Sequence, residues 1–425
     1  MKKKIVAVVS ACVLLVTLCV VAAGCGGCGA KTYTVETSMA DLPKYSSYTD
    51  MIASIRPCVV EVYCEGYDDS GTAIMTSAGA GVIVGKSDDS LIGDGYFIVT
   101  NHHVIENCYS MIVNVLSIGE DGSETTTAYN AQLIGGSHER DIAVLYVKTT
   151  ATLTTATWLA DGDELQVGAE VVAIGNPTGT LGGTVTRGIV SATSRKINVE
   201  NIGSMDLIQM DAAINSGNSG GGLFYTYESA DGEWSAALAG IVNSGATGYD
   251  GLGFAIPAED AMYAVEKLTE TYGTDDELYG YVPGDVGLTI TAAVGNVYNS
   301  SLSGQETIVY ADDTSNEDLD NALDTYEEYR YGTSRQSFDA LRKIVVTDSE
   351  TGKQTETEIT AAQDVYDALA GADAGDSVTI TVEAVETYRM GPFGGVLCLS
   401  GETEDVAIDS LSQYRYTPPD APSFS

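Results

Sequence analysis

Short runs of Val and Ile follow one another from Ile55 to Pro257, and clusters of Gly, Asp, Ser and Asn separate them. No long helical periodicity interrupts this pattern. Short apolar runs bounded by turn residues are typical of antiparallel sheets, and about 200 residues of them suffice for two small barrels. The pattern predicts an all-β double antiparallel barrel, built from runs such as CVVEVY, AGVIVG, GYFIVTN, DIAVLYV, EVVAIGN and ALAGIVN.

A helical pattern first occurs after Pro257. Acidic residues occupy the expected first turn, and Gly273 can end the helix. The helix has one apolar face, with apolar residues at three- and four-residue spacing: Ala261, Met262, Val265 and Leu268. We predict that this helix closes the first module, at residues 49–273.

The rest of the chain predicts a smaller α+β domain at residues 279–395, after a linker, GTDDEL. Its expected strands are GLTITAAV, KIVVTD and SVTITVEAV, and its expected helix is AAQDVYDALAG. The acidic stretch from Asp312 to Glu328 indicates a solvated insertion or helix face. Residues 396–425 are expected to form a tail, with a disordered, Pro- and Ser-rich end.

The N-terminus has the pattern of an export signal. Three lysines precede a mostly apolar segment, Ile5 to Ala23. The sequence that follows, Ala-Ala-Gly-Cys, resembles a bacterial lipobox, in which Cys25 would be lipidated. The alternative of an uncleaved membrane anchor stays open, because the length of this apolar segment is close to the roughly 20 residues that a helix needs to cross a bilayer. We expect residues 1–24 to be a signal peptide or membrane anchor and residues 25–48 to be a tether, with the remainder held outside the cytoplasm.

Composition narrows the classes of partner. The 425 residues, enough for two or three domains, include 60 Asp and Glu against 20 Lys and Arg, a net charge of −40. Binding to nucleic acid is electrostatically unfavourable at this charge, and we expect none. The cysteines outside the N-terminal segment are too few and too scattered for a disulfide scaffold or a zinc site: Cys58, Cys64, Cys108 and Cys398. A bridge from Cys108 to Cys58 or Cys64 and buried free thiols are both open.

A candidate nucleophile, Ser219, lies in the glycine-rich stretch INSGNSGGGLF. Its surroundings also fit G-x-S-x-G, the nucleophile elbow of α/β-hydrolases, but there the catalytic His follows the Ser. The three histidines of this chain, His102, His103 and His138, all precede Ser219, so that class is excluded. The subtilisin order, Asp then His then Ser, expects an alternating α/β pattern that is absent here.

The remaining order is His, Asp, Ser. The segment FIVTNHHVI ends an apolar strand in histidine, and Asp141 stands at the start of the apolar strand DIAVLYV. A Ser hydroxyl needs a neighbouring base, and the base needs a carboxylate that fixes its tautomer. Ser219, His103 and Asp141 can fill these roles. The loop Gly217, Asn218 and Ser219 would supply backbone N–H groups for an oxyanion hole.

Each of these features alone has an ordinary structural explanation. A single His near a strand end is commonly a satisfied or exposed side chain, Asp141 could cap a strand, and a glycine-rich serine loop is commonly a turn. His138 is interpreted as a loop residue near Asp141. Three candidates in the required order within one β-rich module favour catalysis.

Together the stretches TNHHVI, DIAVL, AIGNPTG, TVTRGIVSA, QMDAAINSGNSGGGLF and GFAIP resemble the HtrA/Deg family of trypsin-fold serine proteases, over about residues 50–273. The resemblance implies that the base is His103, directly before Val104. His102 departs from the Asn or Ala common there and is interpreted as a neighbouring polar residue. The family usually forms trimers, so a homo-oligomer is expected.

The same resemblance locates a substrate pocket. The residue six positions before the nucleophile, Ala213, would lie at its base, with Ile214 beside it and Ser244 and Gly245 opposite. This set favours small or medium apolar residues before the scissile bond. Asp211 is interpreted as structural. The backbone from Val242 through Asn243 to Gly245 would pair with the substrate as an added strand.

The family further implies a PDZ domain after the protease. DVGLTI resembles the strand after a PDZ carboxylate-binding loop, here Val286, Gly287 and Leu288, and residues 359–382 resemble the final PDZ helix and strand. The usual AGL-x-x-GD segment is absent, and an acidic, Tyr-rich insertion stands in its place. We therefore expect a divergent PDZ-like domain, whose binding of peptides stays open.

The sequence thus predicts an extracytoplasmic, membrane-tethered serine endopeptidase that cleaves unfolded or damaged proteins through an acyl-enzyme. The alternative is a non-proteolytic peptide-binding or chaperone module that retains the protease fold. The partners expected are unfolded proteins or peptides. Neither a cofactor nor a metal is implied.

Overall fold

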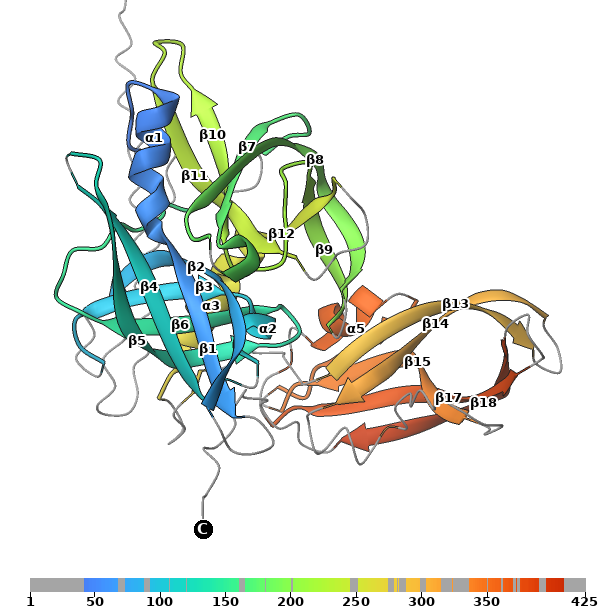
Figure 1. Cartoon of the computed structure of the whole chain (residues 1–425). Helices are drawn as coiled ribbons and strands as arrows, with labels where there is room; N and C mark the ends of the chain where they lie inside the picture. Colours follow the sequence, from blue (N-terminus) through green and yellow to red (C-terminus); the bar gives the residue numbers. More distant parts are fainter. Residues whose placement is uncertain are drawn as a thin grey trace, which may run out of the picture. The chain divides into compact units, whose positions relative to one another are not determined.

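The fold was analysed in a computed structural model of the chain. It describes residues 42–408 apart from gaps, the longest of which are 68–72, 160–164, 245–250, 274–278, 283–287, 315–322, 324–335 and 390–394. The first half of this region consists of two six-stranded antiparallel sheets that close on themselves (Figure 1). This is the double barrel that the sequence predicts, and the fold class is confirmed.

The first barrel has the strand order β1-β2-β3-β6-β5-β4. It closes where β1 pairs with β4, from Glu61 opposite Asn114 to Glu65 opposite Ser110. The strands are β1 (Val59–Tyr67), β2 (Ala73–Ser87), β3 (Gly95–Thr100), β4 (Ser110–Ile118), β5 (Glu124–Ser137) and β6 (Ile142–Lys148).

The second barrel has the order β12-β11-β10-β7-β8-β9 and closes where β12 pairs with β9, at Phe254 opposite Gln209. Its strands are β7 (Glu170–Gly175), β8 (Thr184–Val199), β9 (Gly203–Met210), β10 (Gly222–Glu228), β11 (Trp234–Asn243) and β12 (Gly253–Pro257). Consecutive antiparallel strands need only short turns, which the Gly, Asp and Ser clusters of the sequence supply.

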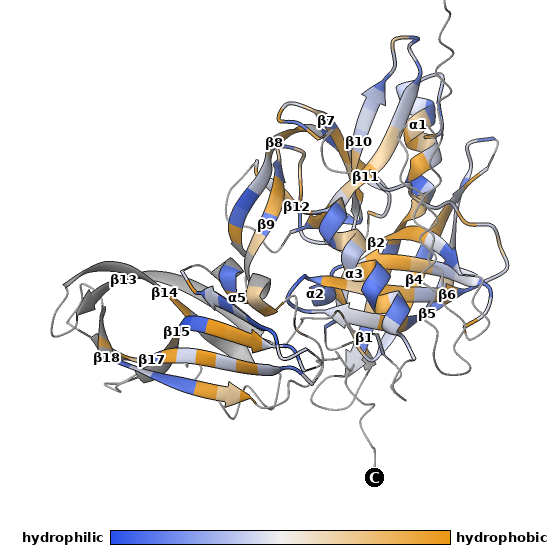
Figure 2. Ribbon diagram, turned by 180° about the vertical axis from the view of Figure 1, so that it is seen from behind, coloured by the Kyte–Doolittle hydropathy of each residue, from blue (hydrophilic) through white to orange (hydrophobic). Residues whose placement is uncertain are grey.

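Strand periodicity determines the core of each barrel. In β4, the apolar side chains of Met111, Val113 and Val115 are buried while the residues between them are more exposed. An alternation of two directs one set of side chains into the barrel. The strands of the barrels carry many hydrophobic residues (Figure 2), and strand β3 is buried at every position. Its continuous apolar run GYFIVT reflects this position.

Three helices accompany the barrels. The predicted helix after Pro257 is confirmed as α3 (Ala258–Thr271), with Glu259 and Asp260 in its first turn and Ala261, Val265 and Leu268 buried. Helix α1 (Tyr48–Ile55) was not predicted. The Ser47 hydroxyl caps it by accepting a hydrogen bond of 3.1 Å from the Asp50 amide. A four-residue helix, α2 (His102–Ile105), follows β3 directly.

The C-terminal region is rich in strands. Its sheet has the order β13-β14-β15-β17-β18, with β16 beside β15 and a parallel pairing of β13 with β18. Three of the strands match predicted runs, and β18 extends into the segment assigned to the tail. The elements are β13 (Leu288–Tyr298), β14 (Ser303–Thr314), β15 (Gln336–Thr347), β16 (Gln354–Glu358), α5 (Ala362–Leu369), β17 (Ser377–Arg389) and β18 (Gly395–Ile408). Its identity as a PDZ-like domain stays a prediction.

Several predictions fall outside the described residues. They concern the export signal, the lipidation of Cys25, the C-terminal end, Gly245, and the Val286 and Gly287 part of the carboxylate loop. Leu288 begins β13. Within the described part of the chain, no helix has the length and apolar character needed to cross a membrane.

Candidate active site

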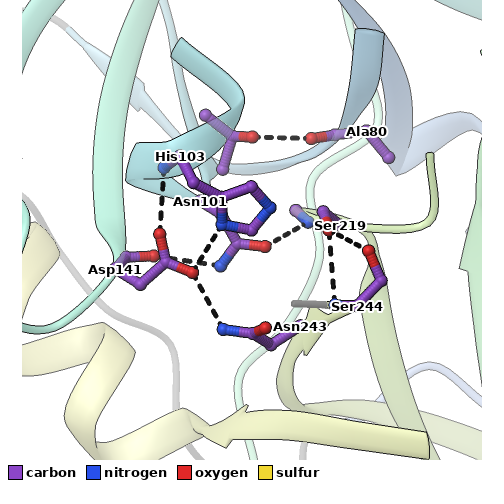
Figure 3. Close-up of polar contacts among 9 residues, drawn as sticks. Ala80, Asn101, His103, Asp141, Ser219, Asn243 and Ser244 are labelled. Carbon is purple, nitrogen blue, oxygen red and sulfur yellow. Dashed lines mark hydrogen bonds and ion pairs between the residues drawn. The ribbon is translucent and has the colours of Figure 1, made fainter. Parts of the chain in front are cut away.

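His103 lies on the short helix α2, where the chain leaves the first barrel at the end of β3. Its Nδ1 is 2.8 Å from Oδ2 of Asp141, and its backbone N–H donates to Oδ1 of the same carboxylate at 3.0 Å (Figure 3). Since a carboxylate only accepts, Nδ1 carries the proton in this contact, and in the neutral imidazole Nε2 then keeps its lone pair. The side chain is 31% exposed, whereas that of Asp141 is fully buried. The imidazole is therefore oriented by a buried carboxylate and is itself accessible from solvent, as a candidate base has to be.

Asp141 lies between β5 and β6 with a φ of 50°. This left-handed conformation is uncommon for residues other than glycine, but Asp and Asn adopt it more readily than most. The turn is closed by a 3.0 Å hydrogen bond from the Asp141 amide to the His138 carbonyl. A buried carboxylate requires donors, and a third one comes from the second barrel: Nδ2 of Asn243 donates to Oδ2 at 2.8 Å. The carboxylate is thus held from both barrels.

Ser219 lies in the loop between β9 and β10, and the structure brings it to the same place as His103 and Asp141. Gly217 and Gly220 on either side of it have φ values of 92° and 82°. A Cβ at position 220 would approach the Ala80 carbonyl oxygen to 2.1 Å, so both conformation and space require glycine there. The loop is thereby pressed against strand β2 of the first barrel.

The hydroxyl of Ser219 bonds to the second barrel in this structure. It forms a short hydrogen bond with the Ser244 hydroxyl and accepts a second one from the Ser244 amide at 3.3 Å. Figure 3 shows the imidazole of His103 facing this loop, with no hydrogen bond between the two side chains. The nucleophile–base contact of a serine protease therefore requires the hydroxyl to exchange Ser244 for His103.

The loop also presents backbone N–H groups. The backbone N–H of Asn218 donates to the Asn215 carbonyl within the loop, at 3.0 Å, and Asn218 is buried. The N–H groups of Gly217 and Ser219 form no hydrogen bond among the described residues. They are available for an oxyanion, as an acyl-transfer site requires.

The predicted pocket residues gather beside this loop. Ala213 is exposed, and its carbonyl accepts a hydrogen bond from the Thr186 hydroxyl at 3.1 Å. Strand β12 lies against Ile214, since a Cβ at Gly253 would come within 2.7 Å of it. The backbone of Val242 is engaged, donating to the Gly221 carbonyl at 2.8 Å and accepting from the Gly220 amide at 3.0 Å. In this structure Val242 therefore offers no free backbone group to a peptide.

The three histidines of the chain come together around Asp141. Burial alone would lower the pKa of His103, but the charge and hydrogen bond of Asp141, with the charge of Glu106, outweigh it and raise that pKa. His102 is buried, and its ring lies edge-on to that of His138 at 5.5 Å. Burial, then His138 and His103, lower the pKa of His102 to about 3. The carboxylate of Asp141 binds both the ring and the backbone N–H of His103.

The sequence analysis gave no role to two polar side chains of this site, those of Asn243 and Asn101. Asn243 was assigned to the substrate strand, but its side chain binds Asp141. Asn101 received no role.

The structure also decides whether Cys108 forms a disulfide with Cys58 or Cys64. All three cysteines are buried free thiols. Among the described residues, no group of three or more His, Cys, Asp and Glu side chains could hold a metal ion.

Two antiparallel barrels with a serine, a histidine and a buried aspartate between them define the architecture of a trypsin-like serine peptidase. In agreement with this architecture, residues 79–230 match the trypsin-like peptidase domain family. The curated relatives that this part of the chain resembles are more specific, because they are serine proteases named HtrA or DegQ.

One relative is the periplasmic pH-dependent serine endoprotease DegQ of Escherichia coli, 34% identical over 257 residues, which are 56% of this chain and 51% of DegQ. Others are the serine protease Do-like HtrA of Bacillus subtilis, 33% identical over 52% of this chain and 49% of the relative, and that of Lactococcus lactis subsp. cremoris, 38% identical over 47% and 46%. The chain spans about half the length of the curated relatives it matches.

Proposed function

We propose that the chain is a serine endopeptidase in which Ser219 attacks the peptide carbonyl, His103 is the general base and Asp141 orients it. The observation that carries the proposal is the 2.8 Å contact between His103 Nδ1 and the buried Asp141 carboxylate, next to Ser219 on its glycine-flanked loop. This contact holds the imidazole in the tautomer that can accept the Ser219 proton at Nε2.

The proposed reaction follows from these positions. The Ser219 hydroxyl leaves Ser244, gives its proton to His103 and adds to the substrate carbonyl. The N–H groups of Gly217 and Ser219 stabilise the oxyanion, and loss of one such donor costs about a hundred- to a thousandfold in rate. The imidazolium, stabilised by Asp141, then protonates the departing amine, and water hydrolyses the acyl-enzyme by the same route.

The substrate class proposed is unfolded or damaged protein outside the cytoplasm. The family relationship and the names of the periplasmic relatives support a protein substrate and this location. Ala213 and Ile214 favour small or medium apolar residues before the scissile bond. Residues 1–24, with Cys25, are proposed to export and tether the protein, and a homo-oligomer and a PDZ-like C-terminal domain are proposed from the family.

The test uses the purified protein from residue 29 onward, with casein and reduced, alkylated albumin as substrates and native albumin for comparison. We expect cleavage of the unfolded substrates, and loss of cleavage in Ser219→Ala. Ser216→Ala is the matched control, because Ser216 is exposed on the same loop and should leave cleavage unchanged. A wild-type protein that cleaves none of the substrates, or equal activity in Ser219→Ala, would overturn the proposal.

The anchor is tested separately in cells. If Cys25 is lipidated, Cys25→Ala should abolish incorporation of labelled fatty acid, while Cys28→Ala should not. Equal labelling in the two variants would contradict lipidation at Cys25, and membrane retention without any label would favour an uncleaved anchor.

A further inference from the structure

Asn101 is a fully buried polar residue at the junction of β3 and α2. It occupies the N-cap position of α2, where an Asn side chain commonly accepts a hydrogen bond from its own helix. Here it makes no such bond. Its amide is directed away from the helix, into the interface between the two barrels (Figure 3).

Both ends of this amide bind backbone of the candidate active site. Nδ2 donates to the Asp141 carbonyl at 2.9 Å, and Oδ1 accepts from the Gly220 amide at 2.7 Å. Gly220 directly follows Ser219, and Asn101 itself lies two residues before His103. One side chain therefore connects the three chain segments that carry the proposed catalytic residues.

A second set of hydrogen bonds, which runs through strand β2, also links the end of β3 to the loop at Ser219. The Thr100 hydroxyl donates to the Ala80 carbonyl at 2.7 Å, and the Ala80 amide donates to the Ser219 carbonyl at 2.8 Å. Residues 100 and 101 thus hold the loop at Ser219 from the first barrel. A side-chain amide suits this position because it has a donor and an acceptor at fixed geometry.

We propose that Asn101 is a positioning residue for peptide-bond cleavage, which sets the backbone of Asp141 and Ser219 so that the imidazole and the hydroxyl can meet. The inference rests on the proposed function. Its physical basis is that displacement of reacting groups by about 1 Å can cost a hundredfold in rate, whereas substrate bound elsewhere in the pocket is little affected. The effect should therefore be on kcat rather than on KM.

The experiment measures kcat and KM for an apolar-residue peptide substrate in Asn101→Ala, which removes both hydrogen bonds, and in Asn101→Asp. The Asp variant is close in size to Asn and keeps an acceptor for the Gly220 amide, but it places an oxygen against the Asp141 carbonyl. It replaces Asn101→Ala as the test if the Ala variant does not fold. We expect kcat to fall about 10- to 100-fold in each, with KM within about threefold of wild type.

The control is Thr269→Val, which removes a buried hydroxyl that bonds within α3 at 2.8 Å, far along the chain from the site. It should lose stability without losing kcat. A readout specific to positioning is the acid limb of the kcat/KM profile. Asp141 raises the pKa of His103, so loosening Asp141 in Asn101→Ala should move this limb to lower pH by about half a unit, and Thr269→Val should not move it.

Folded Asn101 variants with kcat within about threefold of an active wild type would overturn this inference and leave the proposed function intact. The same holds for a kcat loss that Thr269→Val reproduces at equal stability, with no shift of the acid limb. An inactive wild type would overturn both proposals.

Discussion

The two barrels contribute unequal halves to the candidate active site. The first barrel holds an assembled acid–base pair, in which His103 contacts the buried Asp141 carboxylate through both its ring and its backbone, at 2.8 and 3.0 Å. The second barrel holds the proposed nucleophile, Ser219, whose hydroxyl forms a hydrogen bond with Ser244 of the same barrel. The contact between His103 and Asp141 is therefore formed, whereas the Ser219 hydroxyl makes its hydrogen bonds to Ser244.

The difference shows which groups of the site are already held in place and which group must still change its hydrogen-bond partner. Asp141 is held by His103 on one side and by Asn243 of the second barrel at 2.8 Å on the other, so the carboxylate already spans the interface. The peptide unit between Ser219 and Gly220 is fixed by Asn101, which accepts from its N–H, and by Ala80, which donates to its carbonyl. We infer that a hydrogen bond between Ser219 and His103 requires only that the Ser219 hydroxyl exchange Ser244 for His103, with no change in the backbone of either barrel.

Breaking the first half should have the largest effect. In Asp141→Asn the amide can donate to Nδ1 and so favours the imidazole tautomer that cannot act as base, and we expect kcat/KM to fall about 10⁴-fold. The fold should survive, because Asn tolerates the φ of 50°. Peptide hydrolysis and thermal unfolding measure both effects. Asp121→Asn, on an exposed turn, is the control, and a loss below tenfold at position 141 would remove Asp141 from the mechanism.

The first half should also carry an acid-sensitive element. His102 has a pKa of about 3 in the folded protein, against 6.5 for an ordinary His, so below pH 6.5 the unfolded chain binds a proton that the folded protein does not. Its contribution lowers the free energy of unfolding by about 1.4 kcal/mol per pH unit as the pH falls from 6.5 toward 3. The free energy of unfolding, measured by urea titration at a series of pH values, should depend less steeply on pH in His102→Asn than in wild type below pH 6.5. Above pH 6.5 the two proteins should show the same dependence on pH. Equal slopes would contradict the buried neutral state.

Removing the hydrogen bond between the hydroxyls of Ser219 and Ser244 should have a smaller effect, and it should increase the reactivity of Ser219. Ser244→Ala removes the hydroxyl that competes with His103 for Ser219, while the Ser244 backbone amide stays. One hydrogen bond contributes about 1 kcal/mol, so we expect inactivation by a fluorophosphonate to accelerate by up to about fivefold. A rate that falls in Ser244→Ala would mean that this contact assists the nucleophile.

The smallest effect concerns an exposed charge. Glu106, at the end of α2, helps to raise the pKa of His103, so Glu106→Gln should lower that pKa. Because the base must be neutral, activity is lost as the pH falls through this pKa, and the acid limb should move to lower pH by about 0.3 unit. The pH profile of kcat/KM measures it. Glu124→Gln, in a surface ion pair with Arg56, should not move the limb, and a shift to higher pH at Glu106 would contradict the assignment.

The sequence predicts the barrels well because their information is local. Apolar runs separated by turn residues specify strands, and the spacing after Pro257 specifies α3. The position of all three histidines before Ser219 excludes the α/β-hydrolase class, and the lack of an alternating α/β pattern disfavours the subtilisin class. Helix α1 was missed because its eight residues follow a polar segment and have no long periodicity. In the C-terminal region, β14, β16 and β18 were missed, and they include polar and acidic stretches such as QTETE and GETED.

The polar contacts within the site were less predictable, because they join distant segments. An Asn before a short helix predicts a cap, yet Asn101 binds Gly220, 119 positions away. The resting contact between Ser219 and Ser244 similarly depends on how β11 ends beside the nucleophile loop. Such contacts follow from tertiary packing, which overrides the local preference of the side chain.

The most direct test of the account is to identify the residue that a fluorophosphonate modifies, by peptide mass spectrometry of the labelled protein. We predict a single modification at Ser219, absent in Ser219→Ala and strongly reduced in His103→Ala, with full labelling in His102→Asn. Labelling at Ser244, or unchanged labelling of Ser219 in His103→Ala, would contradict a site in which the base of the first barrel activates the serine of the second.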